Sequence, residues 1–272
     1  MKNILLPLLI ILLFNPIVEG QLFESEVYKV NPWIDGAITI GAFGMNTLGL
    51  AITDKKSTLD SMEIISLDAN NINAFDRSAT KQDASKMYQA WDRSDIGMRG
   101  SFILPFFLLL DKEIRGDWAP VIMLYLQAEG ITGTIWSWGA AMHIDRIRPL
   151  VYNPDVAYNE KTFKRNKSSF FSGHTSSSAA ASFFTAKVYC DYHPELGNKK
   201  FIFYGLAVIP PAFTGFYRYK GMKHFPTDVI TGMIVGGATG ILVPHFHKHK
   251  HENLTFIPVT GPYTGFALSL KF

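Results

Sequence analysis

The chain has 272 residues, of which 47% are hydrophobic and 18% are charged, and its net charge is +3. That length accommodates one sizeable domain beside a processing segment, and so small a charge does not indicate a nucleic-acid partner. A single cysteine, Cys190, excludes a disulfide framework within the chain. The sequence contains no Cys-rich or His-Glu-x-x-His pattern, so we expect no metal site.

The N-terminus has the layout of a secretory signal peptide. Lys2 precedes an apolar run over residues 4–14, and Val18 and Gly20 stand at the small-residue positions before Gln21. This pattern predicts a signal peptide over residues 1–20 with cleavage after Gly20. The alternative is an uncleaved first membrane helix, for which the apolar run is short. In either case we expect the chain to enter the export pathway.

Residues 21–253 are predicted to form one all-α domain, a helical bundle with five or six main helices. The main apolar or helical segments in chain order are 33–53, 85–91, 118–142, 174–189, 201–216 and 226–243. In the last of them Gly232, Gly236 and Gly240 fall on one face, a spacing that lets two helix backbones approach closely.

Several of these segments approach the length that crosses a bilayer, namely 33–53, 118–142, 201–216 and 226–243. We therefore expect a membrane-embedded bundle, with a soluble bundle docked on the bilayer as the alternative. The apolar run at 101–110 is too short to cross. If 33–53 and 118–142 cross while 101–110 does not, the residues that follow 142 face the periplasm, as the export signal also favours.

The C-terminal tail, residues 254–272, alternates apolar and polar residues around a Gly261-Pro262 break and is predicted to form a β-hairpin. Before it, histidine and lysine alternate over residues 245–251. Such a run can bind metal, but we favour a solvated, cationic helix end at the membrane surface.

The last apolar helix opens with residues suited to phosphoryl transfer. Pro226 fits the first position of a helix, which places His224 just ahead of the helix and Asp228 within its first turn. A carboxylate on one imidazole nitrogen fixes the tautomer and leaves the other nitrogen free to attack. The helix N-terminus favours a nearby anion, and Arg218 supplies a fork of donors for phosphoryl oxygens.

Two earlier groups of residues complement this chemistry. Ser172 and Gly173 precede a predicted helix, where glycine allows close backbone approach and serine offers a hydroxyl and an amide to an oxyanion. His174 follows at the helix mouth, where it can protonate a leaving oxygen. Arg148 adds a second guanidinium. Together these residues predict a site that holds a tetrahedral oxyanion while one histidine attacks and the other donates a proton.

In this order the three groups resemble the motifs of the type-2 phosphatidic acid phosphatase and vanadium haloperoxidase superfamily, K-x6-R-P, P-S-G-H and S-R-x5-H-x3-D. The resemblance covers residues 140–245. It implies a helical bundle that hydrolyses phosphate monoesters or diphosphates without a metal or other cofactor. It also implies that His224 is the nucleophile, that Asp228 orients it and that His174 is the acid. The residues that would hold the phosphoryl group are Arg148, Arg218, Ser172 and Gly173.

The sequence departs from this pattern at three positions. Ala141 stands in place of the leading lysine, Phe171 in place of the proline of the second motif, and Tyr217 in place of the serine of the third. The last two changes are mild, whereas the missing lysine removes one phosphate-facing cation and counts against a haloperoxidase role. The nearby residues considered as replacements are His143, Arg146, Lys164 and Lys167.

The sequence thus predicts a metal-independent phosphatase of the cell envelope that acts on a phosphorylated lipid or small phosphate ester through a phosphohistidine on His224. The candidate lipids are phosphatidic acid, phosphatidylglycerol phosphate, undecaprenyl diphosphate and a lipid A phosphate. One alternative is a catalytically silent phosphate-binding envelope protein, with Ala141 as the trace of lost activity. The other is a vanadate-dependent haloperoxidase. Retention of both histidines, the aspartate and both motif arginines favours the enzyme.

Overall fold

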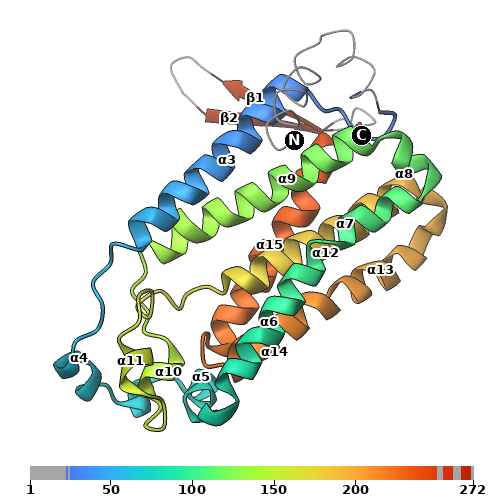
Figure 1. Cartoon of the computed structure of the whole chain (residues 1–272). Helices are drawn as coiled ribbons and strands as arrows, with labels where there is room; N and C mark the ends of the chain where they lie inside the picture. The colour runs from blue at the N-terminus through green and yellow to red at the C-terminus, as the bar shows by residue number, and fades with distance from the viewer. Residues whose placement is uncertain (1–22, 24, 250–253, 260–264, 271–272) are drawn as a thin grey trace, which may run out of the picture.

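A computed structural model describes residues 23, 25–249, 254–259 and 265–270. The predicted signal peptide, residues 1–20, lies outside the described residues. Figure 1 shows long helices lying side by side, with a group of short helices at the lower end of the bundle. At the opposite end Tyr28 and Lys248 form an isolated antiparallel bridge. The first and last described parts of the bundle therefore meet away from the short helices.

Six of the described helices have twelve or more residues, which confirms the predicted all-α bundle with five or six main helices. They are α3 (Pro32–Thr53), α6 (Met87–Ser101), α9 (Trp118–Thr134), α12 (Gly173–Tyr192), α14 (Ile209–Lys220) and α15 (Pro226–His247). The predicted helix at 118–142 is α9 followed by a π-helical stretch, η5 (Ile135–Ala141). The segment at 201–216 divides into α13 (Lys200–Ala207) and α14, because a prolyl residue cannot donate its amide to a continuing helix.

Short helices fill the connections. Those between α3 and α6 are α4 (Ser61–Ile65), η1 (Ala69–Asn71), α5 (Ala74–Arg77), η2 (Ser78–Lys81) and η3 (Ala84–Lys86). The others are α7 (Leu104–Phe107), η4 (Leu108–Leu110), α8 (Lys112–Gly116), α10 (Pro149–Tyr152), α11 (Tyr158–Lys161) and η6 (Pro194–Lys199). Side-chain caps start several of them. In α4, for example, Asp60 accepts from the Glu63 amide while the Glu63 carboxylate accepts from the Asp60 amide.

The predicted glycine face of α15 packs directly on the backbone of α12. A Cβ atom on Gly236 would lie 1.9 Å from the carbonyl oxygen of Ser176. One on Gly232 would lie 2.6 Å from the carbonyl oxygen of Ser172, and Gly240 is equally close to α12 one turn farther on. Because the residue numbers rise together along both helices, α12 and α15 run parallel. Both helices therefore begin at the same end of the bundle.

The segment α6–α7–η4 runs back along the bundle between α3 and α9, which corrects one prediction about the topology. Helices α3 and α9 run parallel, since Gly130 packs on Ala42 while Gly49 packs on Ser137. The chain between them must return along the bundle, and α6, α7 and η4 make that return (Figure 1). The prediction that 118–142 runs back against 33–53 is therefore wrong, because α6, α7 and η4 make the return before α9 begins. That residues 101–110 are too short to cross a bilayer stays a prediction. Because α3 and α9 end at the same end of the bundle, the periplasm-facing site no longer follows from the predicted order of crossings.

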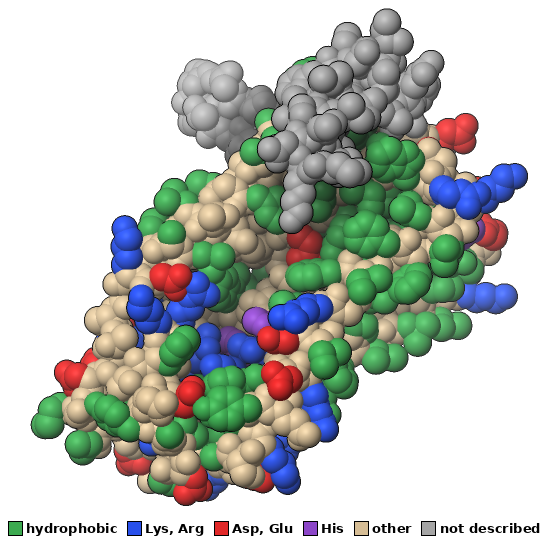
Figure 2. Space-filling view, in the orientation of Figure 1, with side chains coloured by type: hydrophobic (Ala, Val, Ile, Leu, Met, Phe, Trp, Pro, Cys, Tyr) green, Lys and Arg blue, Asp and Glu red, His purple; other side chains and the backbone are tan. Residues whose placement is uncertain are grey.

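Among the described residues, two helices are long and apolar enough to cross a membrane, Pro32–Thr53 and Pro226–His247. Large apolar side chains also lie exposed on the outer faces of the bundle. Examples are Ile34, Ile40, Phe201, Ile209 and Ile234, each at least 60% exposed. Figure 2 shows hydrophobic side chains over much of the upper part of this face, with charged side chains gathered mostly toward the lower end. Apolar exposure of this extent is typical of a surface that meets a membrane or a partner.

Near the C-terminus, β1 (Leu254–Val259) and β2 (Gly265–Leu270) pair antiparallel, with Leu254 opposite Leu270 and Val259 opposite Gly265. The predicted break at Gly261-Pro262 lies outside the described residues. The hairpin tail as a unit, and the domain boundaries at 21–253 and 254–272, therefore stay predictions.

The described part of the His/Lys run ties the bundle together. His247 Nε2 lies 2.9 Å from Asp35 Oδ1, and Lys248 Nζ donates to Asp191 Oδ1 at 2.7 Å. Residues 250 and 251 lie outside the described residues. Within the described part of the chain no group of three or more His, Cys, Asp or Glu side chains can hold a metal ion. At His247 and Lys248 the run joins α15 to α3 and α12, a structural use that the sequence did not predict.

Replacing Gly236 with alanine is expected to destabilise the bundle by about 1–3 kcal/mol, because the new methyl group meets the α12 backbone. Gly205→Ala in α13 is the matched control, since no atom lies within 4 Å of its Cβ position. That change is expected to stabilise the helix by up to ~1 kcal/mol. Thermal unfolding of both variants in one detergent compares them. Equal melting temperatures would show that the α12–α15 contact is loose.

Candidate active site

One cavity of about 400 Å³ gathers five of the seven predicted site residues: Arg148, Gly173, His174, Arg218 and His224. It lies where α12 and α15 begin, and α3, α6, α9 and η5 complete its wall. Figure 2 shows the hollow near the centre of the face, with His and Lys or Arg side chains inside it. The sequence motifs therefore meet in space as predicted, although Asp228 and Ser172 lie behind the cavity wall.

His224 is held by a backbone carbonyl. Its Nδ1 lies 2.6 Å from the carbonyl oxygen of Ser169. Since a carbonyl only accepts, Nδ1 carries the proton and Nε2 is left as the free, nucleophilic nitrogen. The predicted direct contact with Asp228 is longer, because Asp228 Oδ2 lies 3.8 Å from Nδ1. The carbonyl of Ser169 thus does the orienting that the sequence assigned to the carboxylate.

Asp228 acts on His224 through its surroundings. It is fully buried, and its Oδ2 accepts from the hydroxyl of Ser169 at 2.6 Å and from the amide of Phe225 at 2.8 Å. Its other oxygen pairs with Arg146, and its carbonyl accepts from the amide of Ser172 at 3.0 Å. Asp228 therefore fixes both the segment that carries the Ser169 carbonyl and the start of α12.

Ser172 begins α12 as its N-cap. Its hydroxyl accepts from the amide of Thr175, and its own amide donates to the Asp228 carbonyl. The amide that the sequence offered to an oxyanion is therefore occupied, because the helix N-terminus and Asp228 use these groups first. Gly173 does line the cavity, with Trp136 packed so closely that a Cβ would lie 3.2 Å from its ring.

His174 has a partner that the sequence did not reveal. Its Nε2 lies 3.0 Å from Asp95 Oδ1, a residue of α6 that is 79 positions earlier. Burial, then the charge of Arg218, lowers the pKa of His174 to about 4, against the raising effect of Asp95. No motif surrounds Asp95, so only the packing of α6 beside α12 brings the two residues together.

Arg148 and Arg218 are the dominant electrostatic feature. Both are buried, and the Nε of each has no hydrogen-bond partner. The carboxylate paired with Arg218 is Asp95, and it lies 4.0 Å away. Burial lowers the pKa of Arg148 to about 10, and burial together with the charge of Arg148 lowers the pKa of Arg218 to about 9. Two buried guanidinium groups with unpaired donors are costly unless an anion enters between them.

The same charges act on His224. Burial, then Arg218 and Arg148, holds the pKa of His224 well below its usual value. His224 is therefore neutral at neutral pH, the form in which an imidazole can attack. A bound anion offsets the two guanidinium charges and raises the pKa of both histidines, so that binding itself favours protonation of His174.

The comparison with known families agrees with this geometry. The family model described as the PAP2 superfamily matches residues 118–252. The chain belongs to the PAP2 superfamily. The matched span runs from α9 through α15 and includes all seven predicted site residues. Its PAP2 membership supports a phosphoric ester hydrolase.

Among solved structures, a transmembrane PAP2-type phosphatidylglycerolphosphate phosphatase from Bacillus subtilis is similar to this PAP2 chain, with a TM-score of 0.44 and 19% sequence identity. The similarity covers 77% of this chain and 96% of the Bacillus chain. A search of curated proteins gave no significant match.

Arg165 is a third cation at the cavity, in a chain where Ala141 stands in place of the lysine of the PAP2 pattern. Arg165 lines the cavity and is held there by Asp54, with 2.7 Å between Nη2 and Oδ2. Lys223 Nζ lies 3.4 Å from the centre of the Trp91 ring. Burial, then Arg148 and Arg218, lowers the pKa of Lys223 to about 6, so this side chain is mostly neutral at neutral pH. Lys223 directly precedes His224, which is the sequence signal that could have identified it.

The replacements considered from the sequence have other roles. Arg146 pairs with Asp76 at 2.7 Å and with Asp228, so it supports the site from behind. Lys167 pairs with Glu63 at 2.7 Å. Neither His143 nor Lys164 is among the residues that line the cavity.

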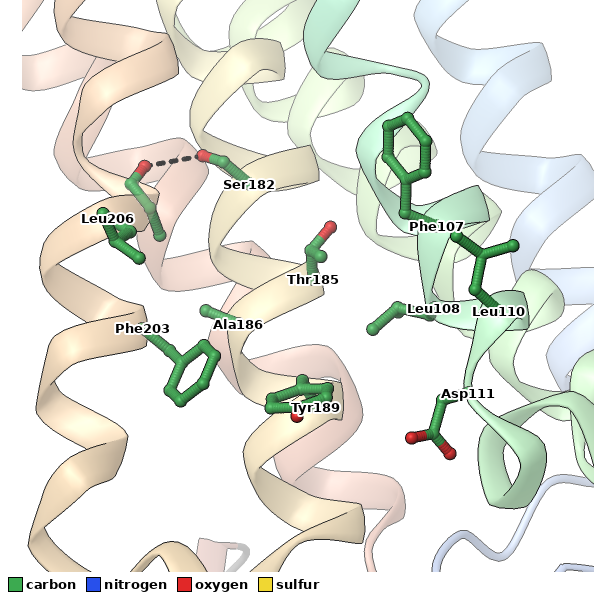
Figure 3. Close-up of a pocket in the computed structure, with 11 residues that line it drawn as sticks. Phe107, Leu108, Leu110, Asp111, Ser182, Thr185, Ala186, Tyr189, Phe203 and Leu206 are labelled. Carbon is green, nitrogen blue, oxygen red and sulfur yellow. Dashed lines mark hydrogen bonds between the residues drawn. The ribbon is translucent and has the colours of Figure 1, made fainter.

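A larger cavity of about 520 Å³ lies elsewhere, between η4, α12 and α13 (Figure 3). Its lining is mostly apolar, including Phe107, Phe203 and Leu206, and its one charged lining residue is Asp111. A cavity with an acidic group and no cation is unsuited to phosphate. The smaller cavity of the two is therefore the candidate active site.

Asp95→Asn is expected to lower the pKa of His174, since Asp95 is the group that favours its protonated form. If His174 protonates the leaving oxygen, the alkaline limb of the kcat profile moves to lower pH. We expect kcat to fall about 10- to 100-fold on esters with poor leaving groups and less on nitrophenyl phosphate. Exposed Asp92 on the same helix gives the control, Asp92→Asn. A pH profile that Asp95→Asn leaves unmoved would refute this role.

Proposed function

We propose that this protein is a metal-independent phosphatase that hydrolyses phosphate monoester or diphosphate groups through a phosphohistidine on His224. The observation that carries the proposal is the pair of buried arginines, Arg148 and Arg218, with unpaired Nε donors beside a histidine whose Nδ1 is fixed. PAP2 membership supports the same class of reaction.

In the first step, the phosphoryl oxygens accept hydrogen bonds from Arg148 and Arg218, and the positive ends of α12 and α15 add to this attraction. Nε2 of His224 attacks the phosphorus atom, and the bond from phosphorus to the leaving oxygen breaks. Since Nε2 of His174 is bonded to Asp95, its Nδ1 is the nitrogen left to protonate that oxygen. The positive charge that forms on the His224 ring is stabilised by the Ser169 carbonyl and by Asp228.

In the second step, water attacks the phosphohistidine and the phosphorus–nitrogen bond breaks. His174, now neutral, accepts a proton from the water and is ready to act as an acid again. Inorganic phosphate leaves, and His224 returns to its neutral form. Every proton moves between water, His174 and the leaving group, so these steps require no further reactant.

The substrate is proposed to be a phosphorylated lipid in the cell envelope. Asn46 and Leu50 of α3 line the cavity, and α3 is one of the two helices with the length and composition to cross a membrane. A phosphate group on a lipid can thus reach the arginines from the bilayer side of the bundle. Exposed apolar side chains on α3, α13, α14 and α15 support membrane association.

A periplasm-facing active site remains part of the proposal and is supported by the export pattern of residues 1–20. A bundle that docks on the membrane from the periplasmic side places the active site in the periplasm. If α3 instead crosses the membrane inward from residue 32, the site faces the cytoplasm.

A cysteine at exposed Lys55 in a chain without its native cysteine, Lys55→Cys with Cys190→Ser, tests the side of the membrane on which the site lies. Lys55 follows α3 at the site end of the bundle. With the outer membrane permeabilised and the inner membrane intact, a maleimide that cannot cross the inner membrane is expected to label it. Labelling only after lysis would place the site in the cytoplasm.

Phosphate release from lipid phosphates in detergent with EDTA tests the chemistry. Wild-type release is expected to persist in EDTA, and His224→Ala is expected to reduce it to background because the nucleophile is gone. Exposed His143 gives the control, His143→Ala, which is expected to retain activity. Alkaline quenching with radiolabelled substrate should trap an acid-labile phosphoprotein in the wild type only.

Three results would contradict the proposal. Release that EDTA abolishes would indicate a metal-dependent reaction, and release that survives His224→Ala would exclude this nucleophile. Binding of inorganic phosphate without release from any lipid would instead support the catalytically silent alternative.

A further inference from the structure

Beyond the phosphate-holding end, the active-site cavity continues to a second group of polar side chains. Asn46 of α3 and Ser177 of α12 both line it. Glu129 of α9 lies behind the lining, where its carboxyl group is hydrogen-bonded to Ser177. Burial raises the pKa of Glu129 to about 8, so the group is mostly protonated at neutral pH. Gly133, which also lines the cavity, lies one turn after Glu129 and so shares its helix face. We call Asn46, Glu129 and Ser177 the inner polar group.

Two acceptor oxygens of this inner polar group receive no hydrogen bond from the protein. Asn46 Oδ1 and Glu129 Oε1 are buried and have no hydrogen-bond partner. A buried acceptor left unpaired costs about 1–3 kcal/mol, so native structures rarely keep one without a ligand or a role. The two arginines at the other end present unpaired donors. The cavity is thus complementary to a ligand with an acceptor-rich anion at one end and donors at the other.

The position of His174 indicates which part of the substrate meets each end of the cavity. His174 and Ser177 are three residues apart on α12 and therefore share a face of the helix. Ser177 lies farther from the helix start, away from the phosphate end. Since His174 protonates the leaving oxygen, the part of the substrate that extends past it toward Ser177 belongs to the leaving group.

We propose that the inner polar group binds hydroxyl groups of the leaving group, so that the substrate is a phosphorylated lipid with a glycerol or sugar head group. This inference rests on the proposed phosphatase function. Hydroxyl groups donate to Asn46 Oδ1 and Glu129 Oε1 and can accept from the hydroxyl of Ser177.

The other candidate lipids fit the inner polar group less well. The leaving group of phosphatidic acid is diacylglycerol, whose neighbouring ester groups only accept hydrogen bonds and leave both acceptors unpaired. The leaving group of a polyprenyl diphosphate is the polyprenyl monophosphate, whose oxygens bring further acceptors toward Asn46 Oδ1 and Glu129 Oε1. A head group with hydroxyls meets neither obstacle.

The test compares kcat/KM for three lipids with matched acyl chains: phosphatidylglycerol phosphate, a phosphorylated glycolipid and phosphatidic acid. The wild type is expected to prefer at least one hydroxyl-bearing lipid over phosphatidic acid by ~10-fold or more, because a site built to bond hydroxyls discriminates strongly against analogues that lack them. The lipid with the highest kcat/KM then identifies the head group as glycerol or sugar.

Glu129→Leu is expected to lower kcat/KM for the preferred lipid by ~10-fold and to bring the ratio of the substrates close to unity. Asn46→Ala is expected to change the ratio in the same direction, which keeps the test informative should one variant fold poorly. Glu113→Gln, at an exposed acidic residue of α8, is the control and should keep the wild-type ratio.

Hydrolysis of all three lipids with no preference, or a preference for phosphatidic acid, would overturn this inference and leave the phosphatase function standing. A wild-type preference that both Glu129→Leu and Asn46→Ala preserve would also overturn it, because the selectivity would then arise elsewhere. Absence of release from every lipid would instead count against the proposed function.

Discussion

The backbone contact between α12 and α15 determines most of what this bundle can do. Glycines at every fourth position of α15 allow the two helices to lie almost backbone against backbone. Because the helices are parallel, their N-termini, each with the positive end of a helix dipole, meet at one end of the bundle. His174 opens the first helix and His224 immediately precedes the second. The two histidines, proposed as nucleophile and acid, and the first turns of both helices are thereby brought to one end of the bundle.

The second constraint is the charge inside that volume. Arg148 and Arg218 are buried with free donors, and the nearby carboxylates are used elsewhere: Asp228 pairs with Arg146, and Asp54 pairs with Arg165. Arg148 and Arg218 therefore keep unpaired Nε donors at the cavity, where the carboxylate beside Arg218 is Asp95 at 4.0 Å. Burial, then the charges of these arginines, lowers the pKa of both histidines, and the unpaired donors suit an anionic ligand.

The sequence predicted the helices and the meeting of the motifs because both depend on local signals: apolar periodicity, glycine spacing, and ordered His, Arg and Asp residues. It did not predict the role of Ser169, since a backbone carbonyl carries no residue identity. Asp95 escaped notice because its link to His174 depends on packing between helices far apart in the chain. The amide of Ser172 was assigned to the substrate, but α12 and Asp228 use it first. The parallel course of α3 and α9 was not predicted, because the return between them starts in α6, a polar helix without the apolar signal of the others.

At the end opposite the site, the amide of Lys29 donates to the carbonyl of His247 at 2.7 Å, beside the bridge between Tyr28 and Lys248. The first and last parts of the described bundle are therefore adjacent in space. The geometry of the site does not depend on the order in which the helices follow one another along the chain. If Tyr28 were linked to Lys248 and the chain reopened in the exposed segment near Asn159, every helix would keep its neighbours. Circular permutation is thus open to this scaffold, and both histidines would then precede the new join, with α3, α6 and α9 following it.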